Sequence, residues 1–115
     1  MAYDEGLAQR LRDLLVDEPA VAGHEVREKK MFGGLAFLVG GNMAVAASGQ
    51  GGLMVRIDPA DGEELVATTA AYPMEMRGRS MGGWLRVDLP DLAEDTALAT
   101  WVRRGASYAA SLPAK

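Results

Sequence analysis

The sequence contains no cysteine and only one histidine, His24, and both scarcities exclude kinds of functional site. Without cysteine the chain has no disulfide, no thiolate zinc site and no cysteine nucleophile. A serine–histidine–acid triad would have to use His24, a lone histidine at the start of a predicted strand, where a surface position is the more common role. H-E-x-x-H and EF-hand spacings are also absent. We therefore expect no catalytic residue, no metal and no cofactor, and we favour a protein that is not an enzyme.

Long hydrophobic runs are missing as well. No apolar stretch approaches the roughly 20 residues that cross a bilayer. The N-terminal segment MAYDEGLAQRLRDLL is acidic and amphipathic, whereas a signal peptide begins basic and continues apolar. These features predict a cytoplasmic protein that does not bind a membrane.

Basic residues are fewer than acidic ones, 12 against 16, which gives a net charge of -4 and argues against non-specific coating of DNA. The charges are unevenly distributed. Residues 77–86 carry three arginines and no acid, whereas residues 88–95 carry four acids and no base. We expect a local basic patch on an acidic body, and a protein partner rather than a nucleic acid.

The chain has 115 residues, of which 49% are hydrophobic, and this is enough for one compact domain spanning residues 1–115. Leucines at helical spacing predict an amphipathic helix over residues 3–17. Asp58-Pro59 predicts the start of a short helix over 58–69. Asp91 with Glu94 resembles a capping box, and an apolar stripe from Leu98 to Leu112 predicts a last helix, in which Gly105 would allow close packing on a sheet.

Between these helices the apolar residues alternate as in β-strands, over residues 24–32, 34–39, 42–48, 52–57 and 83–89. The connections between the first four are too short for crossover helices, so these strands should be antiparallel. The predicted fold is α+β, with an antiparallel sheet of about five strands flanked by N-terminal and C-terminal helices.

Strand alternation also predicts two faces of the sheet. The face under the helices should carry Leu35, Phe37, Val39, Met43, Val45, Ala47, Leu53, Val55, Ile57, Leu85 and Val87. The opposite face should carry Ala36, Leu38, Ala44, Ala46, Met54, Arg56, Trp84 and Arg86, unless a bulge inverts the pattern. This second face is too apolar for water alone, so either the 59–69 helix covers part of it or a partner binds there, with Leu38, Met54, Arg56, Trp84 and Arg86 as the candidate contacts.

Two Gly-Gly pairs, Gly33-Gly34 and Gly82-Gly83, follow cations and lead into strands. A phosphate-binding loop instead places its glycines before a helix, and the Walker and Rossmann spacings are absent. We therefore interpret each pair as a bend or a close backbone approach. The neighbouring cations remain the candidate anion-facing group, which comprises Lys29, Lys30, Arg77 and Arg79 beside Gly33, Gly34, Gly82 and Gly83.

The segments MFGGLAF (31–37), GGNMAVAA, GLMVRID (52–58), PMEM (73–76) and WVRRGASYA (101–109) resemble the TfoX N-terminal domain family, and the likeness runs from about Leu7 to Ala109. The resemblance implies a small α+β domain and a link to regulators of natural competence, which act with the cyclic-AMP receptor protein. Full-length regulators carry a second, C-terminal domain, and we expect this chain to be a stand-alone domain without it. The family supplies no catalytic residue to transfer.

Two functions from different classes follow. The first is a non-enzymatic regulatory or interaction module, whose apolar sheet face or basic group contacts a partner or a second copy of the chain. The alternative is a binding protein or an enzyme for a small molecule or an anion, with a pocket near Trp84 or Trp101. The missing catalytic constellation and the apolar second face favour the first.

Overall fold

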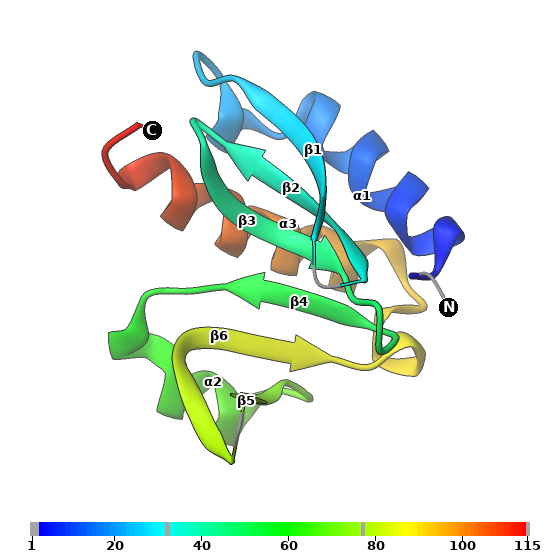
Figure 1. Ribbon diagram of the computed structural model, residues 1–115, viewed down its shortest axis with the longest axis vertical. Coiled ribbons are helices and arrows are strands. Elements are labelled where there is room, and N and C mark those ends of the chain that lie inside the picture. The colour runs from blue at the N-terminus through cyan, green and yellow to red at the C-terminus, as the bar shows by residue number, and fades with distance from the viewer. Residues whose placement is uncertain (1–2, 32, 77, 115) are drawn as a thin grey trace.

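A computed structural model describes residues 3–31, 33–76 and 78–114, apart from the side chains of residues 76 and 79–81. Six strands in this part of the chain form one sheet of order β1-β2-β3-β4-β6-β5, and all neighbours are antiparallel (Figure 1). The strands are β1 (Val26–Met31), β2 (Gly34–Val39), β3 (Asn42–Ala47), β4 (Leu53–Arg56), β5 (Tyr72–Met76) and β6 (Arg79–Val87). The helices are α1 (Glu5–Asp17), α2 (Gly62–Thr68) and α3 (Asp95–Ser111). The predicted α+β fold is confirmed.

The strand that sequence analysis missed is β5, which contains Pro73. Proline cannot donate to a sheet ladder, so its presence argues against a strand in the centre of a sheet. The structure places β5 at the edge, where it pairs with β6 alone. An edge strand tolerates a proline because only one side of it is hydrogen-bonded.

The starts of α1 and α3 have different causes. α1 starts at Glu5 because the Asp4 carboxylate accepts a hydrogen bond from the Leu7 N–H at 2.8 Å. The capping box predicted at Asp91 is wrong. Residues 89–92 instead form a 3-10 turn that buries Leu92 completely, and α3 starts only at Asp95. Burial of Leu92 thus takes precedence over the local capping pattern.

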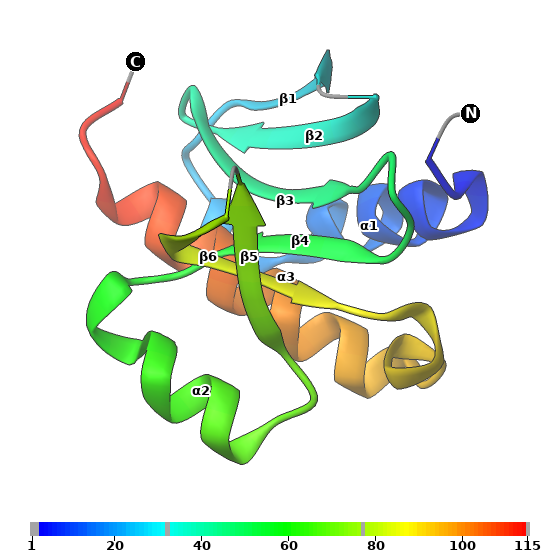
Figure 2. The ribbon, with the colours of Figure 1, turned by 60° about the horizontal axis from the view of Figure 1, so that its bottom comes forward.

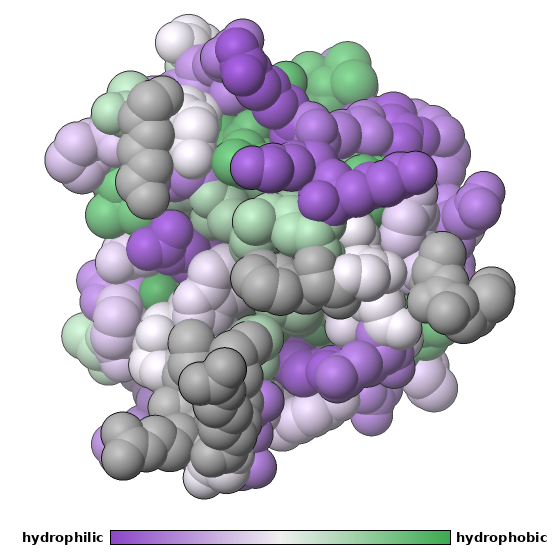
Figure 3. All heavy atoms as spheres, in the orientation of Figure 1, coloured by the Kyte–Doolittle hydropathy of each residue, from purple (hydrophilic) through white to green (hydrophobic). Residues whose placement is uncertain are grey.

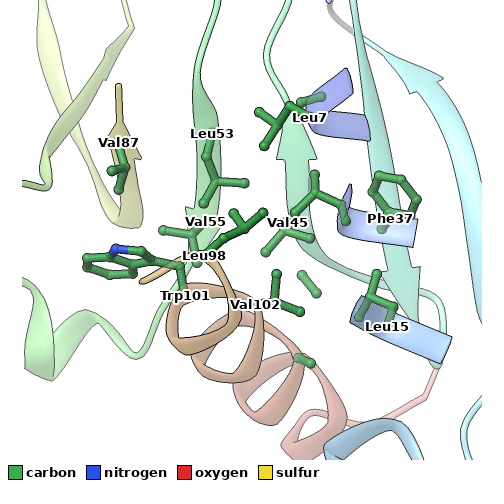
Figure 4. Packing of buried hydrophobic residues seen from close by; sticks show 14 of the residues in the cluster. Leu7, Leu15, Phe37, Val45, Leu53, Val55, Val87, Leu98, Trp101 and Val102 are labelled. Atoms are coloured by element: carbon green, nitrogen blue, oxygen red, sulfur yellow. The ribbon is translucent and has the colours of Figure 1, made fainter. Parts of the chain in front are cut away.

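α1 and α3 cover one face of the sheet and enclose the core with it. Figure 4 shows Val45 and Val55 of the sheet against Leu98 and Val102 of α3. α3 comes very close to β3 at Gly105, where a Cβ atom would lie 2.5 Å from the Ala44 carbonyl oxygen. The predicted role of Gly105 in close packing agrees with this geometry.

A β-bulge in β3 corrects the predicted faces at two positions. The β2–β3 register shifts between Phe37 and Leu38, so that Leu38 pairs with Met43 and Phe37 with Val45. Ala44 is the extra residue, and it is fully buried in the core, whereas Met43 is half-buried on the opposite face. The alternation-based prediction exchanged Met43 and Ala44 because a bulge inverts the side-chain period.

The predicted 58–69 helix is a 3-10 turn over Pro59–Asp61 followed by α2. Leu65 and Val66 of α2 pack against the core cluster, and α2 lies on the same side of the sheet as α3 (Figure 2). α2 therefore contacts β5 and β6 and leaves the centre of the second face, over β2 and β3, uncovered.

Candidate functional site

The face of the sheet that points away from the helices is apolar at its centre. We call it the outer face and define it by Ala36, Leu38, Met43, Ala46 and Met54. Figure 3 shows this face, with an area of hydrophobic colour over β2 and β3 and hydrophilic side chains along β1. The two alanines are nearly buried, and the two methionines and the leucine are half-buried. Three methionines, Met31, Met43 and Met54, line a hollow of only about 10 Å³ there.

One row of directly paired residues crosses the outer face from edge to edge. It consists of Lys29, Ala36, Ala46, Met54, Arg86 and Tyr72, on six successive strands. The row thus places Lys29 and Arg86 on either side of three apolar residues. The backbones of these two cations are four strand spacings apart, about 19 Å. Small residues at the centre of such a row let another backbone approach the sheet closely.

Arg86 is held in place from the neighbouring loop. Its Nη1 donates to the Gln50 side-chain oxygen at 2.6 Å and its Nη2 to the Gly51 carbonyl oxygen at 2.7 Å. Its buried Nε has no hydrogen-bond partner. Tyr72, at the end of the row, donates its hydroxyl to Asp88 at 2.7 Å, and this hydrogen bond raises the pKa of Tyr72. The two hydrogen bonds to Gln50 and Gly51 thus hold the Arg86 side chain in one orientation.

Neither Gly-Gly pair forms a phosphate cradle. Gly33 has a φ of +76° in the β1–β2 turn, and Gly34 packs against the backbone of Ala47 and Gly49. Gly83 has a φ of +85° and lies where the β5–β6 register shifts. Gly34 begins β2 and Gly82-Gly83 lies inside β6, so no helix N-terminus adds free N–H groups. The interpretation as bends and close backbone approaches agrees with the structure.

The candidate cations in the described part of the chain do not form one group. Lys29 pairs with Ala36 of the outer face, whereas Lys30 pairs with Leu35 and points to the helix side. Arg77 lies outside the described residues, and of Arg79 only the backbone, at the start of β6, is described. β1 is one edge of the sheet, and three strands separate it from β6. The end of β1 and the start of β6 also lie at opposite ends of the strands (Figure 1).

Two of the predicted partner-face residues contact the helix layer instead. The Arg56 guanidinium lies 5.6 Å from the Trp84 ring centroid and 5.7 Å from that of Tyr108 on α3. Trp84 also lines a mostly apolar cavity of about 370 Å³ against α2. A second cavity, of about 610 Å³, separates α2 from α3 and is lined by Arg103, Arg104 and three acids. Leu38, Met54 and Arg86 remain on the outer face.

The sequence patterns did not predict the contributions of Met43 and Tyr72 to this face. No signal in the alternating pattern reveals the bulge that turns Met43 outward. Pro73 argued against a strand at the position of β5, which carries Tyr72.

An ion pair ties the edge strand β1 to α1. Arg12 donates from Nε and Nη2 to the two carboxylate oxygens of Glu28, at 2.5 and 2.7 Å. These hydrogen bonds lower the pKa of Glu28 and raise that of Arg12. Because the folded-state pKa of Glu28 is depressed, its contribution to stability is fully present above the ordinary glutamate pKa and is lost as the pH falls through the folded value.

We predict that Glu28→Gln makes the melting temperature less sensitive to acid. Between about pH 6 and about pH 3, the wild type should lose more thermal stability than the variant, since only the wild type has this paired carboxylate to protonate. Thermal unfolding followed by circular dichroism measures the difference. Glu63→Gln, at an exposed position on α2, is the control and should follow the wild type. Identical pH profiles for Glu28→Gln and the wild type would refute the prediction.

Within the described ranges, no group of three or more His, Asp or Glu side chains could hold a metal ion. The described helices include none with the length and hydropathy of a membrane span.

Comparison with known proteins identifies one family. No match to this chain is found among curated proteins or among solved structures. The family model described as the TfoX N-terminal domain matches residues 21–109, from the turn after α1 to the last turns of α3. Since this match covers well over half of the 115 residues, the chain belongs to the TfoX N-terminal domain family.

Proposed function

We propose that this chain is a non-enzymatic regulatory module that binds an acidic protein partner on the outer face. The observation that carries the proposal is the cross-strand row, in which Lys29 and Arg86 flank Ala36, Ala46 and Met54. A partner that carries an apolar centre between acidic residues complements this row in both charge and polarity.

The chemistry of the outer face favours a protein over other ligands. A hollow of about 10 Å³ is too small for a cofactor or a metabolite. Nucleic acid is bound mainly through its phosphates, and an apolar centre of alanine, leucine and methionine offers these nothing. Methionine side chains adapt to the shape of an apolar partner, so Met31, Met43 and Met54 suit a protein surface.

Charge argues against a second copy of the chain on this face. A two-fold contact centred on the row would bring Lys29 of one copy toward Arg86 of the other. Like charges opposed across an interface disfavour association. An acidic partner removes this repulsion, and we therefore expect the isolated protein to be monomeric through this face.

Selection of a random-sequence peptide display library on the immobilised protein tests the proposal. Enriched peptides should carry aspartate or glutamate on both sides of an apolar centre. Met54→Glu places a carboxylate in the centre of the row and should weaken binding of a selected peptide by about tenfold or more. Lys29→Glu should weaken it as well. Ala67→Glu, which adds the same charge at an exposed position on α2, is the matched control and should bind like the wild type.

Four results would contradict the proposal. Enrichment of basic peptides, or unchanged binding by Met54→Glu, would exclude an acidic partner on this face. A doubling of the solution mass that Met54→Glu abolishes would show that a second copy occupies the face instead. The last result is that no peptide is enriched, whereas a nucleotide or acidic metabolite raises the melting temperature equally in the wild type and in Met54→Glu. It would favour the small-molecule alternative at the cavities beside α2.

A further inference from the structure

The edge strand β1 has an open row of backbone hydrogen-bonding groups. The Gly40 N–H donates to the Glu25 carbonyl at 2.8 Å, which makes 25 and 40 a hydrogen-bonded pair of the β1–β2 ladder. Because bonded and non-bonded pairs alternate, Arg27, Lys29 and Met31 bond to β2. The N–H and C=O groups of residues 26, 28 and 30 therefore point away from the sheet, and no described hydrogen bond reaches them.

An apolar groove lies on the helix side of this edge. It has a volume of about 410 Å³ and runs between α1 and the strands β1 and β2, where Leu15, Val16, Val21, Val26 and Phe37 line it. Val16 is 76% exposed and Val26 is 38% exposed, and they are two of the three exposed large hydrophobic residues in the described chain. The Arg12–Glu28 ion pair and His24 supply its polar lining.

The other side of the same edge is cationic. Arg27 pairs with Leu38 and Lys29 with Ala36, so both side chains lie on the outer-face side of β1. Arg27 has an ion pair with Glu25 at 3.1 Å, and Lys29 has none among the described residues. Successive side chains of β1 thus border an apolar groove and a basic surface in turn.

We propose that the β1 edge accepts an extended segment of a partner protein in which apolar residues alternate with acidic ones. A strand added to a sheet edge directs its side chains alternately to the two faces. One row would then enter the groove at Val16 and Val26, and the other would lie beside Arg27 and Lys29. The site shares Lys29 with the cross-strand row of the outer face, but its groove and its edge hydrogen-bonding groups are separate, and it does not require the apolar centre of that face to bind anything.

Lysine on an edge strand normally prevents pairing with other edges. On β1, Lys29 also selects which kind of strand can pair with the edge. A second copy paired antiparallel through β1 would set Arg27 and Lys29 of the two chains side by side on one face, and this repulsion disfavours self-pairing. Acidic side chains on the added strand would instead be attracted to Arg27 and Lys29.

Amide hydrogen exchange measured by NMR tests the proposal on the whole protein. The probe is a synthetic peptide of about eight residues, a typical strand length, that alternates valine with glutamate. It should slow exchange at the amides of residues 28 and 30 by about tenfold or more, while the amides of 27 and 29 are already protected in the free protein. A valine–lysine peptide of the same length is the control and should protect neither amide.

Two variants at one position separate backbone pairing from side-chain effects. Lys30→Pro removes an outward N–H without breaking the β1–β2 ladder, and it should weaken binding of the valine–glutamate peptide by about fivefold to tenfold, the equivalent of one hydrogen bond. Lys30→Ala keeps the N–H and should bind more tightly than Lys30→Pro. Val16→Glu, at an exposed position, should also weaken binding because it places a carboxylate in the groove.

The outcomes distinguish this site from the proposed function. Met54→Glu changes the outer face alone, and so it should leave protection at residues 28 and 30 intact. Peptide binding that protects neither amide, or that is lost in Met54→Glu but kept in Lys30→Pro, would overturn strand addition. Absence of binding by the valine–glutamate peptide, or concentration-dependent protection at the same amides in the free protein, would overturn it as well.

Discussion

Gly105→Ala is expected to lower the free energy of unfolding by about 2 kcal/mol, which corresponds to a drop of about 8 °C in the melting temperature. The new Cβ atom would lie 2.5 Å from the Ala44 carbonyl oxygen and 2.9 Å from Val45 Cγ1. Both neighbours belong to the centre of the sheet, so α3 would have to move away from β3. Overpacking of this kind costs about 3 kcal/mol, and the better helix propensity of alanine returns about 1 kcal/mol.

Gly62→Ala is the matched control for this prediction, because it is the same exchange in another helix. At Gly62 a Cβ atom would lie 3.6 Å from Ile57 Cδ1, an ordinary van der Waals contact. The backbone there is already helical, with a φ of -60° and a ψ of -48°. Thermal or urea unfolding should show a neutral or slightly stabilising effect. If both variants had equal stability, the close contact of α3 with β3 would not be rigid.

Gly34→Ala should also destabilise the fold by about 2 kcal/mol. A Cβ atom at this position would overlap the Ala47 carbonyl oxygen and lie 3.0 Å from the Gly49 nitrogen. All of these neighbours are backbone atoms, so no side-chain rotation relieves the clash, and the β1–β2 turn would separate from the end of β3. Urea unfolding should show the loss as a lower midpoint with an unchanged slope.

Gly82→Ala tests the second Gly-Gly pair by the same exchange. Among the described residues, no atom outside its chain neighbours lies within 4 Å of a Cβ at this position. The variant should therefore unfold within about 0.5 kcal/mol of the wild type, as most surface exchanges do. A loss as large as that of Gly34→Ala would mean that the two Gly-Gly pairs have the same structural role, contrary to the geometry described above.

Periodicity predicted the fold class because the patterns that indicate it are local. The leucines of α1 and the apolar stripe of α3 have helical spacing, and most of the alternating residues of β2, β4 and β6 are buried as expected. Local rules failed where a distant contact overrode them. Burial of Leu92 shifted the start of α3, and edge placement allowed Pro73 into a strand.

The candidate site was predictable only in part. Leu38, Met54 and Arg86 could be assigned to the outer face because alternation holds along β2, β4 and the end of β6. Met43 could not, because nothing in the residues 42–47 indicates the bulge. Lys29 and Lys30 are adjacent in sequence, yet they lie on opposite faces because side chains of a strand alternate.

The sequence by itself determined the α+β fold class, the positions of the terminal helices and the absence of any cysteine-based chemistry, since these depend on composition and on the spacing of near neighbours. Only the tertiary structure decided which side chains share a surface. Strand order placed β1 and β5 at opposite edges, and the bulge turned Met43 outward. The physical reason is that strand order and register depend on how the whole sheet packs against α1 and α3, and no short segment of the chain encodes that packing alone.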